Sequence, residues 1–424
     1  MSKQRINHSQ SARHVIEKIG YENILCSKDT IWTWNNNGVW VMSEDRSIKQ
    51  KIQRVLDGHD YRKSEIDSIL DIIKTVVYKE NHSFDFQKES INCQNGELIY
   101  INKNWVLSSH KRENYRTSQI PVHYDLNAKC PMFDKFLDEI FSNNHEKEKL
   151  IQLVYETIGY CLLSTSEYEK FFIFLGSGAN GKSVLLRVIT ELLGQKNVAG
   201  VQPYKFENSF QLAHLFCKLA NIITEIPKNH KLADGPLKAI TSGELITAEY
   251  KHQKPFDFRP YCTLIFATNY MPHTSDFSNG LLRRIIIIPF NRVFQEKEQD
   301  RKLADKLILE LPGIFNRALQ ALKMLFERGE FTKVDSCEEA KREWELQNNH
   351  LLQFIEDKCI TDINSEEQSG KLFDEYTKWC SDNLVNHRLS RNNFTKEMQR
   401  KGFNKKRGAG GTRYIEGIKL KRDD

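Results

Sequence analysis

Short apolar runs alternate with longer amphipathic stretches through the middle of the chain. The run at 171–175 is typical of a strand that is buried on both faces, and the stretch at 184–193 has the period of a helix. Further strands are expected at 220–224, 263–268 and 284–288, and a helical segment at 300–327 closes the series. Buried strands that alternate with helices predict an α/β fold with a parallel sheet.

The sequence before this sheet has a mixed pattern. Alternating Trp, Thr and Val residues at 32–34 and 39–41 flank Asn-Asn-Asn-Gly, which is a hairpin signal, and helices are expected near 48–56 and 64–78. We interpret the tryptophans as core residues rather than as platforms for stacked bases. The pattern predicts a small α+β domain at 1–110, then a linker and helical collar at 111–165, which precede a central domain at 166–330 that holds the parallel sheet.

The end of the chain has a pattern of its own. A connector at 331–350 leads to a last domain at 351–424, with helices expected at 351–358, 369–383 and 390–401 and a Gly-rich basic hairpin after them. Three helices followed by a two-stranded basic wing resemble a winged helix.

Composition changes this picture mainly through charge. The chain carries a formal net charge of +6, and residues 388–424 hold 12 Lys/Arg against 4 acids, a local net charge of +8. The remaining 50 Lys/Arg and 52 acids give −2, so the basic character lies at one end, as a nucleic-acid contact requires. A merely solvated basic tail is the alternative.

Cysteine spacing and hydropathy exclude several classes of protein. The 9 cysteines are scattered and form no C-x-x-C pair, so disulfide and zinc frameworks are not indicated. No apolar run reaches the length of a membrane span, and no apolar signal core follows the N-terminus. We expect a cytoplasmic protein with no membrane partner, in a bacterial host.

The segment that follows the run at 171–175 carries the clearest chemistry. It reads Gly-Ser-Gly-Ala-Asn-Gly-Lys-Ser, which matches G-x-x-x-x-G-K-[ST] between a strand and a helix, the context of a phosphate-binding loop. Backbone N–H groups would wrap the phosphates of ATP, the lysine would neutralise their charge, and the serine hydroxyl would ligate Mg²⁺. The predicted nucleotide-binding residues are Gly176, Gly178, Ala179, Asn180, Gly181, Lys182, Ser183 and Val184.

Two further strands end in polar residues. Glu225 follows the run at 220–224, and Asn269 follows the run at 263–268. A P-loop ATPase needs a carboxylate near the γ-phosphate, either to hold Mg²⁺ or to polarise the attacking water, and an amide that orients this water. We predict that Glu225 does the first, as base or metal ligand, and that Asn269 does the second.

Two basic features have a functional and a plain interpretation. Arg283 and Arg284 precede the strand at 284–288 and are either surface ion-pair residues or an arginine finger. The segment at 243–258 has a hairpin pattern with Lys251, His252 and Lys254 at its turn. This turn is either merely exposed to solvent or binds a phosphate backbone.

These residues, in this order, resemble the superfamily 3 helicases, specifically the primase-helicases of phages, plasmid-like elements and poxviruses. The resemblance runs through nearly the whole chain, from Asn95-Gly96 and the segment at 130–137 through the phosphate loop to Ile288-Pro289-Phe290. It implies an AAA+-type P-loop ATPase core, a homo-hexameric ring with ATP between subunits, and hairpins that hold one DNA strand in the channel. It also implies 3′ to 5′ translocation, and it makes Lys251 and His252 strand contacts.

The chain departs from this family in two ways. Many relatives carry a priming polymerase ahead of this region, but residues 1–110 are too few for one, so priming is absent or belongs to a separate primase or polymerase chain. Glu225 is also a single acid, because Thr224 stands where a second carboxylate is common. The Mg²⁺ shell would then rely on Ser183, Glu225 and water.

The last domain is expected to bind duplex DNA, either at a specific origin or loosely, or to act only in docking. Its candidate contacts are the exposed cations of the third helix and the hairpin: Arg391, Lys396, Arg400, Lys405, Lys406, Arg407 and Arg413. The whole chain is therefore expected to be an ATP-dependent replicative DNA helicase of a phage or mobile element. The alternative is an ATP-switched initiator or loader that remodels origin DNA without processive unwinding, and a small-molecule kinase is disfavoured because no lid segment is evident.

Overall fold

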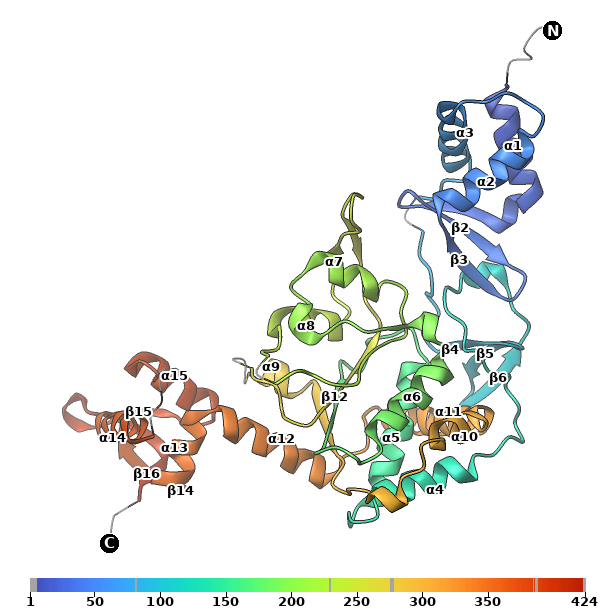
Figure 1. The fold of residues 1–424 in the computed structure, drawn as a ribbon. Coiled ribbons are helices and arrows are strands. Elements are labelled where there is room, and N and C mark those ends of the chain that lie inside the picture. Colours follow the sequence, from blue (N-terminus) through green and yellow to red (C-terminus); the bar gives the residue numbers. More distant parts are fainter. Residues whose placement is uncertain are drawn as a thin grey trace. The chain divides into compact units, whose positions relative to one another are not determined.

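The structure is a computed structural model that describes residues 6–80, 82–228, 230–274, 278–383, 385 and 388–421. It contains two compact units (Figure 1). The larger unit comprises Met1–Pro272 and Gly280–Cys337, and the smaller unit comprises His273–Asn279 and Glu338–Asp424.

A five-stranded parallel sheet forms the centre of the larger unit, which confirms the predicted α/β fold class. Its strands are β7 (Phe171–Leu175), β8 (Val198–Ala199), β9 (Ala220–Ile223), β12 (Thr263–Thr268) and β13 (Ile285–Pro289). They lie in the order β13-β7-β12-β9-β8. Because β7, β9 and β12 are buried almost throughout, their sequences are mostly apolar and do not alternate, although β9 contains Asn221 and β12 has a threonine at each end.

Helices pack on this sheet in one continuous core. They are α4 (Pro131–Ile140), α5 (Lys147–Cys161), α6 (Lys182–Leu193), α10 (Leu303–Ile308) and α11 (Leu311–Arg328). Three shorter helices, α7 (Ser209–Leu212), α8 (Asp234–Thr241) and α9 (Asn279–Leu282), and the two-stranded hairpin β10 (Ile246–Ala248) and β11 (Phe256–Phe258) lie in the loops between strands.

The single helical segment expected at 300–327 is wrong, because the structure divides it into α10 and α11. Glu310 lies at the break, and its carboxylate accepts from the backbone N–H groups of Met132 at 3.2 Å and Phe133 at 2.9 Å. These N–H groups lie at the N-terminus of α4, where no carbonyl of the same helix can accept from them. The carboxylate of Glu310, at the break between α10 and α11, therefore caps α4.

The N-terminal part has a small core of its own. Helices α1 (His8–Ile19), α2 (Asp45–Val55) and α3 (Lys63–Val76) pack together beside the antiparallel sheet β1 (Ile24–Ser27), β2 (Thr30–Asn35) and β3 (Val39–Ser43) (Figure 1). The predicted hairpin is confirmed as β2 and β3. Trp32 is 4% exposed and Trp40 is 2% exposed, so their interpretation as core residues is confirmed.

A second antiparallel sheet belongs to the central core. It consists of β4 (Ser90–Cys93), β5 (Gly96–Ile101) and β6 (Asn104–Ser108). Trp105 donates from Nε1 to the carbonyl of Leu319 at 3.1 Å, and the rings of Tyr100 and Phe326 lie 5.0 Å apart. These contacts attach the second sheet to α11.

The smaller unit is an α+β arrangement. Helix α12 (Asp335–Asn348) enters it from the larger unit, and it continues with α13 (His350–Lys358), α14 (Ser369–Asp382) and α15 (Arg391–Arg400). The rings of Phe354, Tyr376 and Phe394 form its core. Ser390 caps α15 as expected, since its hydroxyl accepts from the N–H of Asn393 at 3.4 Å.

The expected two-stranded wing is wrong in one respect. Strands β15 (Lys405–Arg407) and β16 (Arg413–Leu420) form the predicted hairpin, but β14 (Cys359–Gln368) pairs with the other edge of β16 and makes a three-stranded sheet. Strand β14 has no clear signal in the sequence, because it is mostly exposed and carries few apolar residues.

The structure also contains short 3₁₀ helices between these elements: Tyr21–Asn23, Arg112–Asn114, Gln195–Asn197, Pro203–Lys205, Ala213–Leu215, Glu296–Glu298 and Ala409–Gly411. Within the described part of the chain, no helix is both long and apolar enough to cross a bilayer.

Candidate nucleotide site and nucleic-acid interface

The loop between β7 and α6 has a backbone that few residue types can adopt. Gly178, Ala179 and Gly181 have φ angles of 104°, 47° and 84°, and Gly181 is the N-cap of α6. A Cβ on Gly176 would lie 2.5 Å from the carbonyl oxygen of Phe290. Backbone turns with positive φ orient successive N–H groups into an anion-binding concavity at a helix N-terminus.

Lys182 lies over this loop with only 5% of its surface exposed. Its Nζ donates to the carbonyl of Gly176 at 2.7 Å and to Oδ1 of Asn180 at 2.9 Å. The Nδ2 of Asn180 in turn donates to the carbonyl of Phe290 at 3.1 Å, which attaches the loop to the end of β13. Burial lowers the pKa of Lys182 to about 8, and the negative charge of Glu225 partly opposes this shift.

Register places the two polar strand ends beside the loop. The N–H of Gly176 donates to the carbonyl of Thr268 at 3.1 Å, and the N–H of Ile226 donates to the carbonyl of Ala267 at 3.1 Å. Glu225 and Asn269 therefore lie at the carboxyl edge of the sheet, where the loop also lies, and both side chains are exposed. The structure thus gathers Lys182, Glu225 and Asn269 at one edge.

The residues present fit a magnesium ion that is held together with a nucleotide. Among the described residues no cluster of three or more His, Cys, Asp or Glu could form a cage made of protein ligands alone. Mg²⁺ is ordinarily held through one or two carboxylates, phosphates and water, so such a cage is not needed. Ser183 and Glu225, both exposed at this edge, are the ligands that the chain can offer.

One residue near this edge was not found by sequence reasoning. Gln202 donates from Nε2 to the backbone carbonyl of Glu225 at 3.1 Å. Its Oε1 is buried and accepts no hydrogen bond from the residues that the structure describes. Nothing in the sequence around Gln202 signals this position, which arises from the packing of the segment after β8 against the end of β9.

The two candidate arginines lie at the opposite edge of the sheet. Both precede β13, which runs parallel to β7 over five residues. At about 3.3 Å per residue they lie roughly 17 Å from the phosphate loop of their own chain. Arg284 is 7% exposed and bonds Ser242 Oγ at 2.6 Å and Glu169 at 3.0 Å, whereas the side chain of Arg283 is 60% exposed and pairs with Glu169 at 2.8 Å.

The hairpin of β10 and β11 presents its cations to solvent. Lys251, His252 and Lys254 are all exposed at its tip, and His252 has a φ of 66°. An aromatic stack supports its base, where the ring of Phe256 lies 5.2 Å from that of Tyr250 and 5.3 Å from that of Phe216. The tip is thus a projection with a packed aromatic base and exposed basic side chains at its end.

The predicted cations of the smaller unit are exposed on α15, β15 and β16. Lys405, Lys406, Arg407 and Arg413 line a hollow of about 340 Å³. Arg407 and Arg413 are direct cross-strand partners, and like charges in such a pair are destabilising. Lys406 is balanced by Glu366 at 2.8 Å, and Arg391 by Asp374 at 3.2 Å.

Comparisons with known proteins match three parts of the chain. Residues 12–142 match the model described as "D5 N terminal like", and residues 346–421 match "Poxvirus D5 protein-like". Both of these models carry the D5 name, and they match the two ends of the chain. Between these matches, residues 174–284, which include the phosphate loop, match a family of unknown function (DUF5906).

Two viral proteins show the same relationship at the level of sequence. The chain is 26% identical over 176 residues to "Putative helicase L207/L206" of Acanthamoeba polyphaga mimivirus, which covers 40% of this chain and 18% of that protein. It is 22% identical over 378 residues to "Putative helicase 184R" of Invertebrate iridescent virus 6, with coverages of 76% and 38%. The chain thus spans well under half the length of either relative.

Solved structures show the same fold. The apo A form of the NrS-1 C-terminal region aligns with a TM-score of 0.52 and 13% identity, covering 95% of this chain and 99% of that one. A second apo structure of the NrS-1 C-terminal region (305–718) aligns with a TM-score of 0.51 and 13% identity, covering 98% and 100%. The likeness therefore extends along almost the whole chain.

Proposed function

We propose that this chain is an ATP- and Mg²⁺-dependent DNA helicase that serves replication of a virus or mobile element. In this proposal it has a superfamily 3, AAA+-type P-loop core, works as a homo-hexameric ring, and moves 3′ to 5′ along one strand. The five domains take the boundaries expected from the sequence, and the smaller unit acts as a winged helix. A separate primase or polymerase chain would supply primers.

One observation carries the proposal. A buried lysine, a serine at a helix N-terminus, a carboxylate and an amide converge at the carboxyl edge of a parallel sheet, through Lys182, Ser183, Glu225 and Asn269. Ligands of open α/β sheets bind at this edge, where loops leave the carboxyl ends of the strands. The family and its viral relatives named as helicases support the same conclusion.

Each residue has a distinct task in ATP hydrolysis. Lys182 binds the phosphates and offsets charge that develops as the terminal phosphoryl group leaves. Glu225 accepts a proton from the attacking water, and Asn269 orients that water. Ser183 would hold Mg²⁺, and this ion, when bound, would supply positive charge that offsets the charge of the phosphate oxygens.

The arginines support a site that is completed between subunits. Neither can reach the phosphate loop of its own chain across the length of β13, so a catalytic role for either requires a neighbouring chain. Arg284 is engaged with Ser242 and Glu169 in the folded chain, while the guanidinium of Arg283 is largely exposed. We therefore assign the finger to Arg283 and a positioning role to Arg284.

The DNA contacts divide between two surfaces. Exposed Lys251, His252 and Lys254 suit a single strand that moves with the hairpin tip, because flexible ammonium groups bind phosphates without reading sequence. The cations of α15, β15 and β16 suit duplex binding in the smaller unit.

The decisive experiment is unwinding of a forked DNA by the purified chain with ATP and Mg²⁺. Glu225→Gln should retain ATP binding and lose both hydrolysis and unwinding, since the amide keeps the size of the side chain but cannot accept the proton. A chain that hydrolyses ATP and binds origin DNA but never separates a fork would favour the initiator or loader instead. Loss of ATP binding in Glu225→Gln would give Glu225 a structural role.

Mixing experiments test the ring. Arg283→Ala alone and Lys182→Ala alone should each abolish hydrolysis, whereas mixed oligomers should recover part of it at interfaces that pair an intact loop with an intact arginine. If mixtures with normal assembly recover no activity, the finger assignment is wrong.

A further inference from the structure

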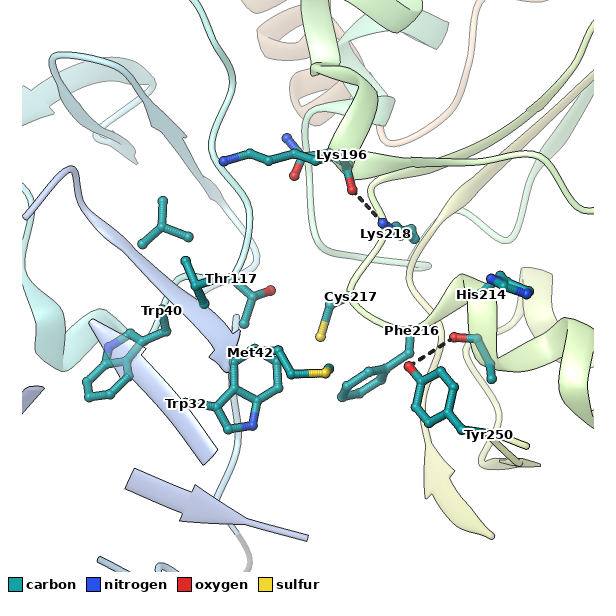
Figure 2. A pocket seen from close by; sticks show the side chains of 14 residues that line it. Trp32, Trp40, Met42, Thr117, Lys196, His214, Phe216, Cys217, Lys218 and Tyr250 are labelled. Atoms are coloured by element: carbon teal, nitrogen blue, oxygen red, sulfur yellow. Dashed lines mark hydrogen bonds between the residues drawn. The ribbon is translucent and has the colours of Figure 1, made fainter. Parts of the chain in front are cut away.

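The larger unit contains a pocket that the proposed ATPase and hairpin contacts do not use. It has a volume of about 390 Å³ and is lined on one side by β2 and β3 and on the other by residues 213–218 and Tyr250 (Figure 2). Hydrogen bonds join the two parts of the chain that form these sides, because Lys28 Nζ donates to the carbonyl of Asp257 at 2.5 Å and the Tyr261 hydroxyl donates to Asp85 Oδ2 at 3.1 Å. Its volume lies in the range of ligand pockets.

The walls of the pocket consist of aromatic rings and a flexible methionine side chain. Figure 2 shows the Met42 side chain reaching across the pocket between Trp32 and Phe216. The rings of Trp32 and Phe216 lie 6.3 Å apart at 72°, and Met42 and Val41 are 39% and 44% exposed. Methionine adapts its shape and makes favourable contacts with ring systems. The surfaces that a flat π system could contact here are Met42 and the half-buried rings of Phe216 and Tyr250, while the buried ring of Trp32 packs against Phe216.

The rim of the pocket carries basic side chains. Lys196 and His214 are exposed there, and Lys218 is half-buried with its Nζ donating to the carbonyl of Lys196 at 2.5 Å. None of the described residues that line the pocket is acidic. Aromatic walls beside a positive rim are the combination that single-stranded nucleic-acid sites use, with bases on rings and phosphates on cations.

The pocket is continuous with the hairpin. Tyr250 lines it and directly precedes the cationic tip that begins at Lys251, and the Tyr250 hydroxyl bonds the carbonyl of Ala213 at 3.4 Å. A strand whose phosphates contact the tip therefore has a neighbouring base within reach of the pocket. A free nucleotide offers the same base and phosphate chemistry, but the continuity with the tip favours a strand.

We propose that this pocket binds an unpaired base of the strand held by the hairpin, with its flanking phosphates on Lys196 and His214. The site would read no sequence, because stacking on rings and methionine is available to every base. The proposal rests on the nucleic-acid contact in the proposed function and adds to it a second point of attachment, on the N-terminal sheet.

The test uses the full chain and a short oligothymidine strand that contains one photoreactive 5-iodouracil. Irradiation should cross-link the wild-type chain at Met42, Phe216 or Tyr250, located by mass spectrometry. Met42→Glu, which brings a carboxylate into the pocket, should weaken strand binding by about fivefold or more, while Met42→Lys, of similar size and opposite charge, should not weaken it. Thermal unfolding of both variants shows whether each is folded. The cross-linking measurement uses the wild-type chain, so it does not depend on the folding of a variant.

The outcomes separate the two proposals. Cross-links confined to residues 251–254 or to the smaller unit, with Met42→Glu binding as wild type, would overturn the pocket and leave the helicase proposal standing. Loss of the pocket cross-link on addition of thymidine monophosphate alone, at concentrations that leave the strand bound, would assign the pocket to a free nucleotide and overturn the strand. No strand binding by the wild-type chain would overturn both.

Discussion

The phosphate loop and the hairpin tip show two ways to place a positive charge. Lys182 is 5% exposed and hydrogen-bonded to the loop, which is itself bonded to β13. Lys251, His252 and Lys254 are exposed, and among the described residues they form no ion pair. The first charge is fixed by packing at one point, and its pKa falls because of burial. The others remain hydrated and can follow a moving ligand.

This difference implies different consequences of substitution. In the loop, a side chain acts as part of a packed network, so its removal changes both geometry and charge. At the tip, removal changes charge alone. The pair Arg407 and Arg413 resembles the tip, because removing these side chains should also change mainly the charge. The two like charges lie side by side in the sheet, which lowers its stability. The predictions below use this contrast.

The largest effect is expected from Lys182→Ala. It removes the charge that offsets developing negative charge on the phosphates, so ATP hydrolysis should fall by about a thousandfold or more, measured as phosphate release. Arg187→Ala is a matched control on α6, since its exposed ion pair with Asp305 is worth about 0–1 kcal/mol. Turnover near the wild-type rate in Lys182→Ala would refute the nucleotide site.

A smaller but selective effect is expected from Lys251→Ala combined with His252→Ala. Fork unwinding should fall by more than about tenfold, because the strand loses its contact with the tip. Hydrolysis measured without DNA should fall far less, since the tip lies outside the nucleotide edge. Gln253→Ala is the control, because Gln253 is an exposed but uncharged residue between His252 and Lys254. Equal losses of hydrolysis and unwinding would show that the tip supports the fold instead.

Arg407→Ala with Arg413→Ala should weaken duplex binding and change its dependence on salt. Each phosphate contact contributes about 0.9 to the slope of log affinity against log salt, so the slope should become shallower by about 2. Unfolding stability should stay equal or rise by about 0.2–1 kcal/mol as the like-charged pair disappears. Lys371→Ala, an exposed cation on α14, should change neither quantity. An unaltered slope would exclude both arginines from the interface.

The smallest effect concerns pH and nucleotide affinity. The pKa of Lys182 is lowered to about 8, so in the free protein this lysine loses its proton as the pH rises above that value. Binding of phosphates then requires proton uptake, and ATP affinity should fall by up to about tenfold per pH unit above 8. Calorimetry in buffers of different ionisation enthalpy would measure the uptake. Lys182→Arg should show a flat profile, and a falling profile in that variant would point to another group.

Much of the central sheet could be predicted from the sequence. Strands β7 and β12 have the expected bounds because each has an unbroken run of apolar residues, and Glu225 and Asn269 reach the expected edge because the strands of this sheet are parallel. Their roles stay predictions. The contacts that support the site could not be predicted, since Gln202 and the carbonyl of Phe290 are brought there by tertiary packing.

The elements that were missed share one physical cause. Strand β14 is largely exposed, so it lacks the apolar alternation that marks a half-buried strand. The break before α11 depends on Glu310, whose partners are 178 and 177 residues away in sequence. In both places the local structure depends on contacts with residues that are distant in the sequence. The hydrophobic pattern of a short segment carries no information about such contacts.

Strand β13 connects the proposed arginine finger to the phosphate loop of the same chain. Arg283 stands before its first residue, while beyond its last residue the carbonyl of Phe290 holds Asn180 and the N–H of Phe294 donates to Ala179 at 2.8 Å. In a ring, one rigid rod would thus touch the neighbour's ATP at one end and its own loop at the other. Subunits connected in this way would hydrolyse ATP one after another rather than independently. Strand β13, rather than the DNA, would then set the order in which the subunits use ATP.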